Sequence, residues 1–292
     1  MERGMRERTE YPAGVPCWVD TAQPDADAAA AFYAGLFGWE FEDRTPAGMP
    51  GRYLVGQLRG RDVAAISSQV AGTAPAPAWS TYVAVDDADE AAGRAAAAGG
   101  SVLMDPVDAS DAGRVGVIAD REGATIGLWQ AKAAIGAHLV NEPGTWNFSE
   151  LNTRDPAGAA EFYRAVFGWE TVTVDIPEGA FSMFRLPGYG DNLEADDPGL
   201  RERQAADGAP EGFEDTVAWL LPMDEGRQPE GTPPHWSITF ATDDADGAAE
   251  RAERLGGTVL VPPFSAPWVR MTVLRDPQGA VFTASRYTPS TS

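Results

Sequence analysis

The chain has 292 residues, of which 44 are acidic and 22 basic, so its formal net charge is −22 at pH 7. Because nucleic acids and anionic membrane surfaces are held by Lys and Arg, this balance excludes both as expected partners. A single cysteine excludes an internal disulfide and a cysteine-rich zinc site, while a hydrophobic fraction of 43% is enough for the buried cores of one large or two ordinary domains.

Neither a targeting segment nor a membrane span is expected. The first ten residues, MERGMRERTE, are charged and precede no apolar stretch, unlike a secretory signal. No apolar run reaches the 18 or so residues that are needed to span a bilayer. We therefore expect a cytoplasmic protein.

The phrase FYAGLFGWE at residues 32–40 returns as FYRAVFGWE at 162–170. In each copy the apolar side chains recur every three to four residues, which is one face of an amphipathic helix. Asp25 and Asp155 precede these faces and are predicted to cap the helices. Glycine follows each face, where helices commonly stop. The phrase is therefore interpreted as a helix, its end and the first residues of a strand.

A second repeat lies between the two phrases. The stretch 78–103, which begins AWSTYVAVDDAD, matches 235–260, which begins HWSITFATDDAD, and each predicts a strand, a capped helix and a strand. Two further strands joined by a glycine-containing turn follow at 113–129 and 269–285. Each half therefore contains two units of one strand, one helix and further strands, and the whole chain contains four.

These repeats predict the domain organisation. We expect an N-terminal tail at 1–11, a first domain at 12–131, a linker at 132–144 and a second domain at 145–288. The second half is longer because an acidic stretch rich in Gly and Pro is inserted near 187–216. We expect an exposed loop there, with a lid over a pocket as the functional alternative.

The four units resemble the vicinal oxygen chelate superfamily, which groups glyoxalase I, bleomycin- and fosfomycin-resistance proteins and extradiol dioxygenases. The two nine-residue phrases, the two DDAD segments and the turns DREGA and DPQGA carry the resemblance, which covers about residues 12–288. It implies an α+β fold of four βαβββ modules. These modules would form two tandem glyoxalase-like domains, with curved mixed sheets around a cleft.

Catalytic members of this superfamily hold a divalent metal in the cleft with His, Gln and Glu. Counting from the aspartates and turns of the motifs places the equivalent positions at Trp18, Ser80 and Gly127 in the first half and at Phe148, Ser237 and Thr283 in the second. None of these side chains is an imidazole, a carboxylate or a thiolate, which such ions need. The resemblance therefore implies a lost metal site and no cofactor. If this count from the motifs is wrong by two residues, which stay on the same face of a strand, Glu150 and His235 could hold a relocated metal.

Strand alternation predicts which side chains line the clefts instead. Asp20 and Glu150 recur at matching positions and are the candidate acid–base residues, because an inward-facing carboxylate is costly without a partner. Arg114 and Arg270 also match between the halves and are the alternative, structural partners. The candidate ligand-binding residues are Trp18, Ser80, Tyr82 and Trp129 in the first half and Trp146, Phe148, Asn152, His235, Ser237 and Thr283 in the second.

Aromatic clefts with a few hydroxyls and one carboxylate suit a flat apolar ligand. The sequence thus predicts a metal-free small-molecule binding protein of the glyoxalase/bleomycin-resistance type, whose ligand is an aromatic or apolar metabolite such as an antibiotic or a biosynthetic intermediate. The alternative is a lyase, isomerase or dioxygenase-like enzyme that uses Glu150 or Asp20 as acid or base, or a relocated metal. The chain would be a monomer with an internal pseudo-dimer or a homodimer.

Overall fold

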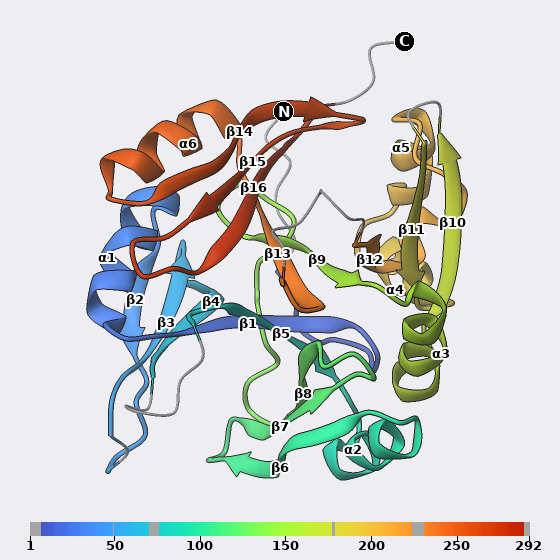
Figure 1. Cartoon of the computed structure of the whole chain (residues 1–292), viewed down its shortest axis with the longest axis horizontal. Coiled ribbons are helices and arrows are strands. Elements are labelled where there is room, and N and C mark those ends of the chain that lie inside the picture. The colour runs from blue at the N-terminus through green and yellow to red at the C-terminus, as the bar shows by residue number, and fades with distance from the viewer. Residues whose placement is uncertain (1–6, 49, 70–75, 177–178, 224–230, 289–292) are drawn as a thin grey trace.

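The computed structural model describes residues 7–48, 50–69, 76–176, 179–223 and 231–288, and each half of the chain forms one eight-stranded mixed sheet (Figure 1). Across sheet A the strands are β2 (Glu40–Asp43), β3 (Tyr53–Leu58), β4 (Arg61–Ser68), β1 (Pro16–Gln23), β5 (Trp79–Ala84), β8 (Thr125–Ala131), β7 (Gly113–Ala119) and β6 (Ser101–Ala109). Across sheet B they are β10 (Glu170–Ile176), β11 (Gly179–Arg185), β12 (Thr216–Pro222), β9 (Trp146–Thr153), β13 (His235–Ala241), β16 (Val281–Tyr287), β15 (Val269–Arg275) and β14 (Thr258–Ala266). The strand order is the same in both, and the predicted α+β fold of four βαβββ modules is confirmed.

One helix belongs to each module: α1 (Ala26–Phe37), α2 (Ala88–Ala97), α3 (Pro156–Phe167) and α6 (Ala245–Arg254). The helices that contain the two repeated phrases begin and end where the sequence predicted. The Asp25 carboxylate accepts the backbone N–H of Ala28 at 2.9 Å, and Asp155 caps α3 in the same way. Gly38 and Gly168 follow the helices with φ of 77° and 76°, a left-handed conformation that glycine adopts without strain.

The hydrophobic cores are shared between the halves. Helix α1 packs against α6 and α2 packs against α3, so the first module contacts the fourth and the second contacts the third (Figure 1). One core joins α2 and β8 to the phrase at 162–170, and the other joins the phrase at 32–40 to α6 and β16. Between the sheets, β5 contacts β13. Neither half therefore encloses a large core by itself.

Buried tyrosines link the halves through polar contacts. The hydroxyl of Tyr33 donates to Asp276 in the last turn of the other half at 3.0 Å and accepts the indole N–H of Trp79 at 3.0 Å. Tyr33 is fully buried and Asp276 is 3% exposed. Asp276 also accepts the side-chain N–H of Gln23 at 2.9 Å. A buried carboxylate needs such donors, so this contact can form only when both halves are in place.

The pseudo-symmetric copy of this contact uses the second phrase. Tyr163 donates to Asp120 of the first half at 3.1 Å and accepts the indole N–H of Trp236 at 2.9 Å. The tryptophan of each phrase also reaches across, because Trp39 donates to the Gly144 carbonyl and Trp169 to the Gly14 carbonyl, at 2.6 and 2.7 Å. The repeated phrase therefore sets the fit between the halves as well as the end of a helix.

The inserted stretch is more regular than its sequence indicates. The prediction of an exposed loop at 187–216 is wrong for much of it, because α4 (Tyr189–Asp196), α5 (Leu200–Ala206) and the 3₁₀ turn η1 (Phe213–Asp215) lie there. Local polar contacts stabilise these short helices. Glu194 accepts the backbone N–H groups that begin α5, and Arg201 pairs with Asp191 and Glu214 at 2.6 and 2.9 Å. Acidic residues that were expected to lie in a solvated loop thus form ion pairs and cap a helix.

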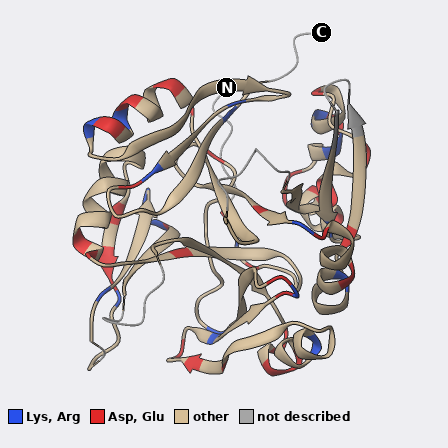
Figure 2. Ribbon diagram, in the orientation of Figure 1, with Lys and Arg blue, Asp and Glu red and all other residues tan. Residues whose placement is uncertain are grey.

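Charge is spread over the whole molecule. Figure 2 shows Asp and Glu on helices and strands of both halves, with Lys and Arg scattered among them. No described helix is long and apolar enough to cross a membrane.

We predict that Tyr33→Phe lowers the free energy of unfolding by about 1–3 kcal/mol, because it leaves the Trp79 indole N–H and part of the Asp276 carboxylate unsatisfied. Urea denaturation measures the change. The control is Thr173→Val, whose hydrogen bond to Ser182 is exposed and can be replaced by water, so its cost should stay below about 0.5 kcal/mol. Equal losses in the two variants would contradict the linking role of Tyr33.

Candidate functional site

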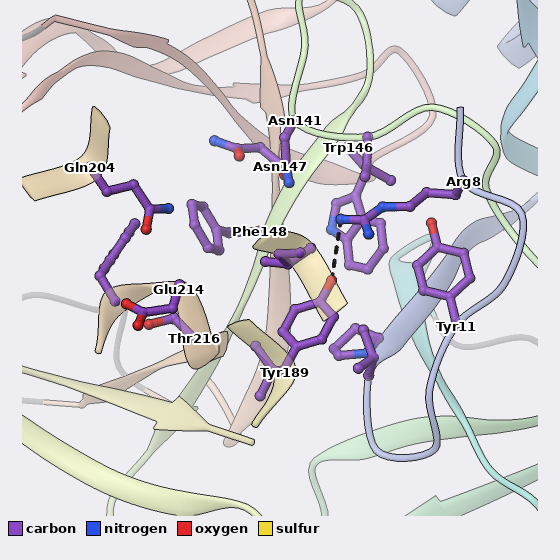
Figure 3. Close-up of a pocket in the computed structure, with 16 residues that line it drawn as sticks. Arg8, Tyr11, Asn141, Trp146, Asn147, Phe148, Tyr189, Gln204, Glu214 and Thr216 are labelled. Atoms are coloured by element: carbon purple, nitrogen blue, oxygen red, sulfur yellow. Dashed lines mark hydrogen bonds between the residues drawn. The ribbon is translucent and has the colours of Figure 1, made fainter. Parts of the chain in front are cut away.

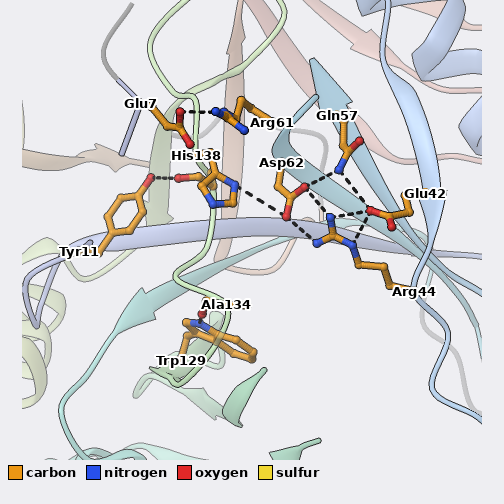
Figure 4. Close-up of polar contacts among 11 residues, drawn as sticks. Glu7, Tyr11, Glu42, Arg44, Gln57, Arg61, Asp62, Trp129, Ala134 and His138 are labelled. Carbon is orange, nitrogen blue, oxygen red and sulfur yellow. Dashed lines mark hydrogen bonds and ion pairs between the residues drawn. The ribbon is translucent and has the colours of Figure 1, made fainter. Parts of the chain in front are cut away.

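The outer face of sheet A is closed by its own aromatic residues and by the linker. Trp18, Tyr53, Tyr82 and Trp129 pack there in one cluster, and Trp18 is only 9% exposed. The stretch 132–144 contains no helix or strand, and it contacts this cluster through Ala137 and Val140 and passes beside Trp129 (Figure 4). The first-half cleft expected from the sequence is therefore filled by protein.

Hydrogen bonds hold the linker in this position. The indole N–H of Trp129 donates to the Ala134 carbonyl at 2.8 Å, and the hydroxyl of Tyr11 donates to the Ala137 carbonyl at 2.7 Å. The His138 backbone N–H donates to the Asp62 carbonyl at 2.8 Å, and Arg44 binds the Asp62 carboxylate in a two-pronged contact (Figure 4). The linker is thus a fixed part of sheet A.

A glycine explains why no ligand side chain stands at the first-half metal position. Gly127 lies beside Tyr82 in the parallel pairing of β8 with β5. A Cβ atom at Gly127 would lie 2.0 Å from the Tyr82 ring, which no packing tolerates. The space that a metal-binding Glu would need is occupied by this tyrosine.

Asp20 lies in the same closed cluster. Its carboxylate accepts the Tyr82 hydroxyl at 3.1 Å to each oxygen, and it lies opposite Ser80 in the pairing of β1 with β5. Burial raises the pKa of Asp20 from 3.8 to about 7, and the Tyr82 hydrogen bond opposes this shift only partly. Of the sequence-predicted residues, Ser80 and Tyr82 therefore lie beside Asp20, and Trp18, Tyr82 and Trp129 belong to one packed cluster.

The outer face of sheet B, which we call the aromatic face, is different. Phe148 is 5.5 Å from Trp219 and 6.5 Å from Phe213 between ring centroids, and Phe181 stands 5.2 Å from Trp219. These rings are only partly buried. Trp268 extends the group at 6.3 Å from Phe181. Edge-on and tilted contacts of this kind leave ring faces available for stacking with a flat molecule.

A carboxyl group lies beside these rings. Glu150 is two residues along β9 from Phe148 and accepts the hydroxyls of Thr239 at 2.5 Å and Ser237 at 3.1 Å. The Asn152 amide donates to Ser237 at 2.9 Å and so completes a short polar chain. Thr283 pairs with Thr239 in the parallel register of β16 with β13 and adds a third hydroxyl to this row.

Among the residues that the structure describes, none forms an ion pair with Glu150 that would keep it charged. Arg270, the partner considered from the sequence, binds Asp246 in the first turn of α6, and Arg114 binds Asp89 in the same way. Burial therefore dominates and raises the pKa of Glu150 from 4.5 to about 7, although the Thr239 and Ser237 hydroxyls favour its charged form. At neutral pH this group can both donate and accept a proton.

The donors present do not fit the divalent metal of the resembling superfamily. Among the residues that the structure describes, no three His, Cys, Asp or Glu side chains lie close enough together to hold a metal ion. At the beginning of β13, the His235 ring nitrogen Nδ1 forms a hydrogen bond with the Pro233 carbonyl at 2.9 Å. Glu150 is surrounded by neutral hydroxyls, which bind such ions weakly.

Two features of this face differ from strand alternation. Trp146 is 5% exposed and belongs to a core cluster shared by the two halves, and the register of β9 and β13 shifts between Thr239 and Phe240, so strict alternation does not hold at this end of β9. The sequence reasoning also missed the rings contributed by β11, β12 and the inserted stretch. Their register could not be read from a segment without a counterpart in the first half.

Known proteins are similar to this chain over its whole length. The family described as "Glyoxalase-like domain" matches residues 133–285, and that described as "Glyoxalase/Bleomycin resistance protein/Dioxygenase superfamily" matches residues 18–128. The Mycobacterium tuberculosis protein named "Putative glyoxylase CFP32" is 39% identical over 98% of this chain and 99% of its own. "Anthracycline biosynthesis protein DnrV" of Streptomyces peucetius is 33% identical over 94% of both chains.

Solved structures share the fold. The Mn(II)-bound glyoxalase from Novosphingobium aromaticivorans covers 94% of this chain and 82% of its own with a TM-score of 0.59 and 16% identity. A mutant 4-hydroxymandelate synthase from Streptomyces coelicolor covers 97% and 95%, with a TM-score of 0.57 and 15% identity. At this identity the likeness concerns the fold alone.

The raised pKa of Glu150 predicts a pH-dependent stability. Because the folded protein holds this proton more tightly than the unfolded chain, the stabilisation is complete below about pH 4.5 and is lost as the pH rises through about 7. Glu150→Gln cannot ionise, so its melting temperature should rise relative to the wild type across this range. Thermal melts from pH 4.5 to 8 measure the difference. Asp243→Asn, at an exposed site, is the control and should follow the wild type. Parallel curves for Glu150→Gln and wild type would refute the shift.

Proposed function

This chain belongs to the glyoxalase/bleomycin resistance protein/dioxygenase superfamily, and from that premise we propose that it binds a flat, largely apolar small molecule on the aromatic face of sheet B without a metal ion. The observation that carries the proposal is the group of partly buried rings around Trp219, next to the carboxyl group of Glu150.

The chemistry of this face supports a ligand with one polar edge. Rings at Phe148 and Trp219 would stack on an aromatic body and exclude water from it. The Glu150 carboxyl and the Thr239 hydroxyl would then meet a hydroxyl or carbonyl group on the edge of the ligand. A carboxyl group that is half protonated at neutral pH suits either kind of group.

Polycyclic aromatic molecules are the ligand class that fits best. The relative DnrV, which covers 94% of this chain, is named for anthracycline biosynthesis. We infer that this chain takes a related flat ring system, such as an antibiotic or a biosynthetic intermediate. The face of sheet A is not the expected site, because the linker and Tyr82 fill it.

A second candidate function is catalysis by Glu150. A carboxyl group with a pKa of about 7 is matched to proton transfer at neutral pH, as in a lyase or isomerase. In that case Glu150→Gln would abolish turnover while leaving the affinity for the ligand within a few fold. A pure binding protein would show no turnover of a bound ligand in either form.

Binding can be tested with 1,4-dihydroxyanthraquinone as a flat aromatic probe. We expect it to quench the tryptophan fluorescence of the protein, and we expect Trp219→Leu to weaken binding about tenfold, which corresponds to roughly 1.4 kcal/mol. The matched control is Tyr53→Leu, which removes a ring from the closed face of sheet A and should leave the affinity unchanged. Equal effects of the two variants would overturn the placement of the site.

Metal content provides an independent test. We expect purified protein to contain less than about one tenth of an equivalent of Mn, Fe, Ni or Zn by elemental analysis, because the donor set around Glu150 binds such ions weakly. A stoichiometric metal that disappears in Glu150→Gln would contradict the metal-free site and favour a relocated one.

A further inference from the structure

A partly polar cavity lies beside the first residues of β9. It has a volume of about 100 Å³ and opens between the N-terminal segment 8–16, the first residues of β9 and the inserted stretch (Figure 3). Its polar walls are formed mainly by Arg8, Asn141, Trp146, Asn147, Gln204 and Glu214. A single water needs roughly 10–15 Å³ on the same measure, so a carboxyl group attached to the edge of a ring can be accommodated.

Two buried polar atoms of this wall lack a hydrogen-bond partner among the described residues: the Trp146 indole nitrogen, a donor, and the Gln204 side-chain oxygen, an acceptor. The indole N–H of Trp146 has no hydrogen-bond partner among the described residues, although the side chain is 5% exposed. A buried donor without a partner costs about 1–3 kcal/mol, so a bound acceptor would recover this cost. The Trp146 nitrogen is itself covered, and an acceptor reaches it only after a side-chain shift of the kind that commonly accompanies binding.

Arg8 supplies a positive charge that is only loosely engaged. Its guanidinium donates to the Tyr189 hydroxyl at 3.3 Å and stands 3.7 Å from the Asp196 carboxylate, which is beyond a good hydrogen bond (Figure 3). The side chain of Asp196 is 64% exposed, so this pair is weak. The acidic wall residue Glu214 is already bound to Arg201 at 2.9 Å.

We propose that this cavity binds the carboxylate of a small aromatic acid. Arg8 and the Trp146 indole would donate to the carboxylate oxygens, and a planar guanidinium matches a carboxylate better than other anions. The ligand carboxylate replaces the exposed Asp196 as the partner of Arg8. The protein carries a net charge of −22, so this local arginine has to offset a long-range repulsion.

The aromatic part of the ligand follows from the residues that the cavity shares with the aromatic face. Phe148 and Phe213 line the cavity and also belong to the ring group around Trp219. A ring attached to the carboxylate would therefore contact Phe148. Only the contact between Phe148 and the ring of the ligand rests on the proposed function. The carboxylate contacts depend on Arg8 and Trp146 alone.

The test uses the full-length protein labelled with ¹⁵N and titrated with benzoate. The indole N–H signal of Trp146 is assigned as the one lost in Trp146→Phe, and benzoate should shift it in a saturable manner. Benzamide has the same shape without the charge and should bind at least tenfold more weakly. Arg8→Gln should reduce benzoate affinity at least tenfold, because it removes the cation.

A second variant separates a binding role of Arg8 from a structural one. Asp196→Asn removes the competing carboxylate and should tighten benzoate binding by about two- to fivefold, whereas a purely structural ion pair would make both variants behave alike. The proposal is overturned if benzoate and benzamide bind equally, if the Trp146 signal does not move, or if Asp196→Asn weakens binding as Arg8→Gln does. Trp219→Leu should weaken binding of the anthraquinone probe about tenfold but spare the Trp146 shift with benzoate, so failure of either site can be recognised separately.

Discussion

The buried contact between each phrase tyrosine and the aspartate of the opposite half constrains the rest of the structure. Tyr33 donates to Asp276 and Tyr163 to Asp120, so the hydroxyl hydrogen of each tyrosine and the Oδ2 atom of each carboxylate find their partners in the opposite half. The apolar cores obey the same constraint, because each combines helices from the two halves. The inner faces of the sheets form this shared interior, and the candidate site lies on the opposite face of sheet B. The position of the candidate site is thus a consequence of how the halves pair.

The two outer faces have the same strand order but different surfaces. On sheet A the linker crosses the face, and Tyr82 occupies the space beside Gly127. On sheet B the inserted stretch places Phe213 beside Phe148, and Phe148 and Trp219 stay partly exposed. A repeat of one fold therefore provides one closed face and one aromatic face. The closed face anchors the linker, and the aromatic face is the one on which we propose ligand binding.

Much of the candidate site could be predicted from the sequence, because its central strands belong to the repeat. Matching the two halves identified Glu150 and Asp20 as carboxylates that face the predicted clefts, and in the structure both have a raised pKa. The same count indicated the loss of the usual metal ligands. It could not find the Trp219 ring, because register is visible only where two copies can be compared. It also missed the register shift in β9, which interrupts the alternation between Trp146 and Phe148.

The module order and the helix ends could be predicted because they depend on local patterns of apolar residues, caps and glycines that each half repeats, and the fold followed from the resemblance that these repeats carry. Which modules pack together, and that Arg8 of the N-terminal segment lies in one cavity wall with Trp146, became visible only in the folded molecule. Those features depend on contacts between residues far apart in the chain. Their partners are fixed by shape and burial in the assembled molecule, and no local pattern in the sequence records them.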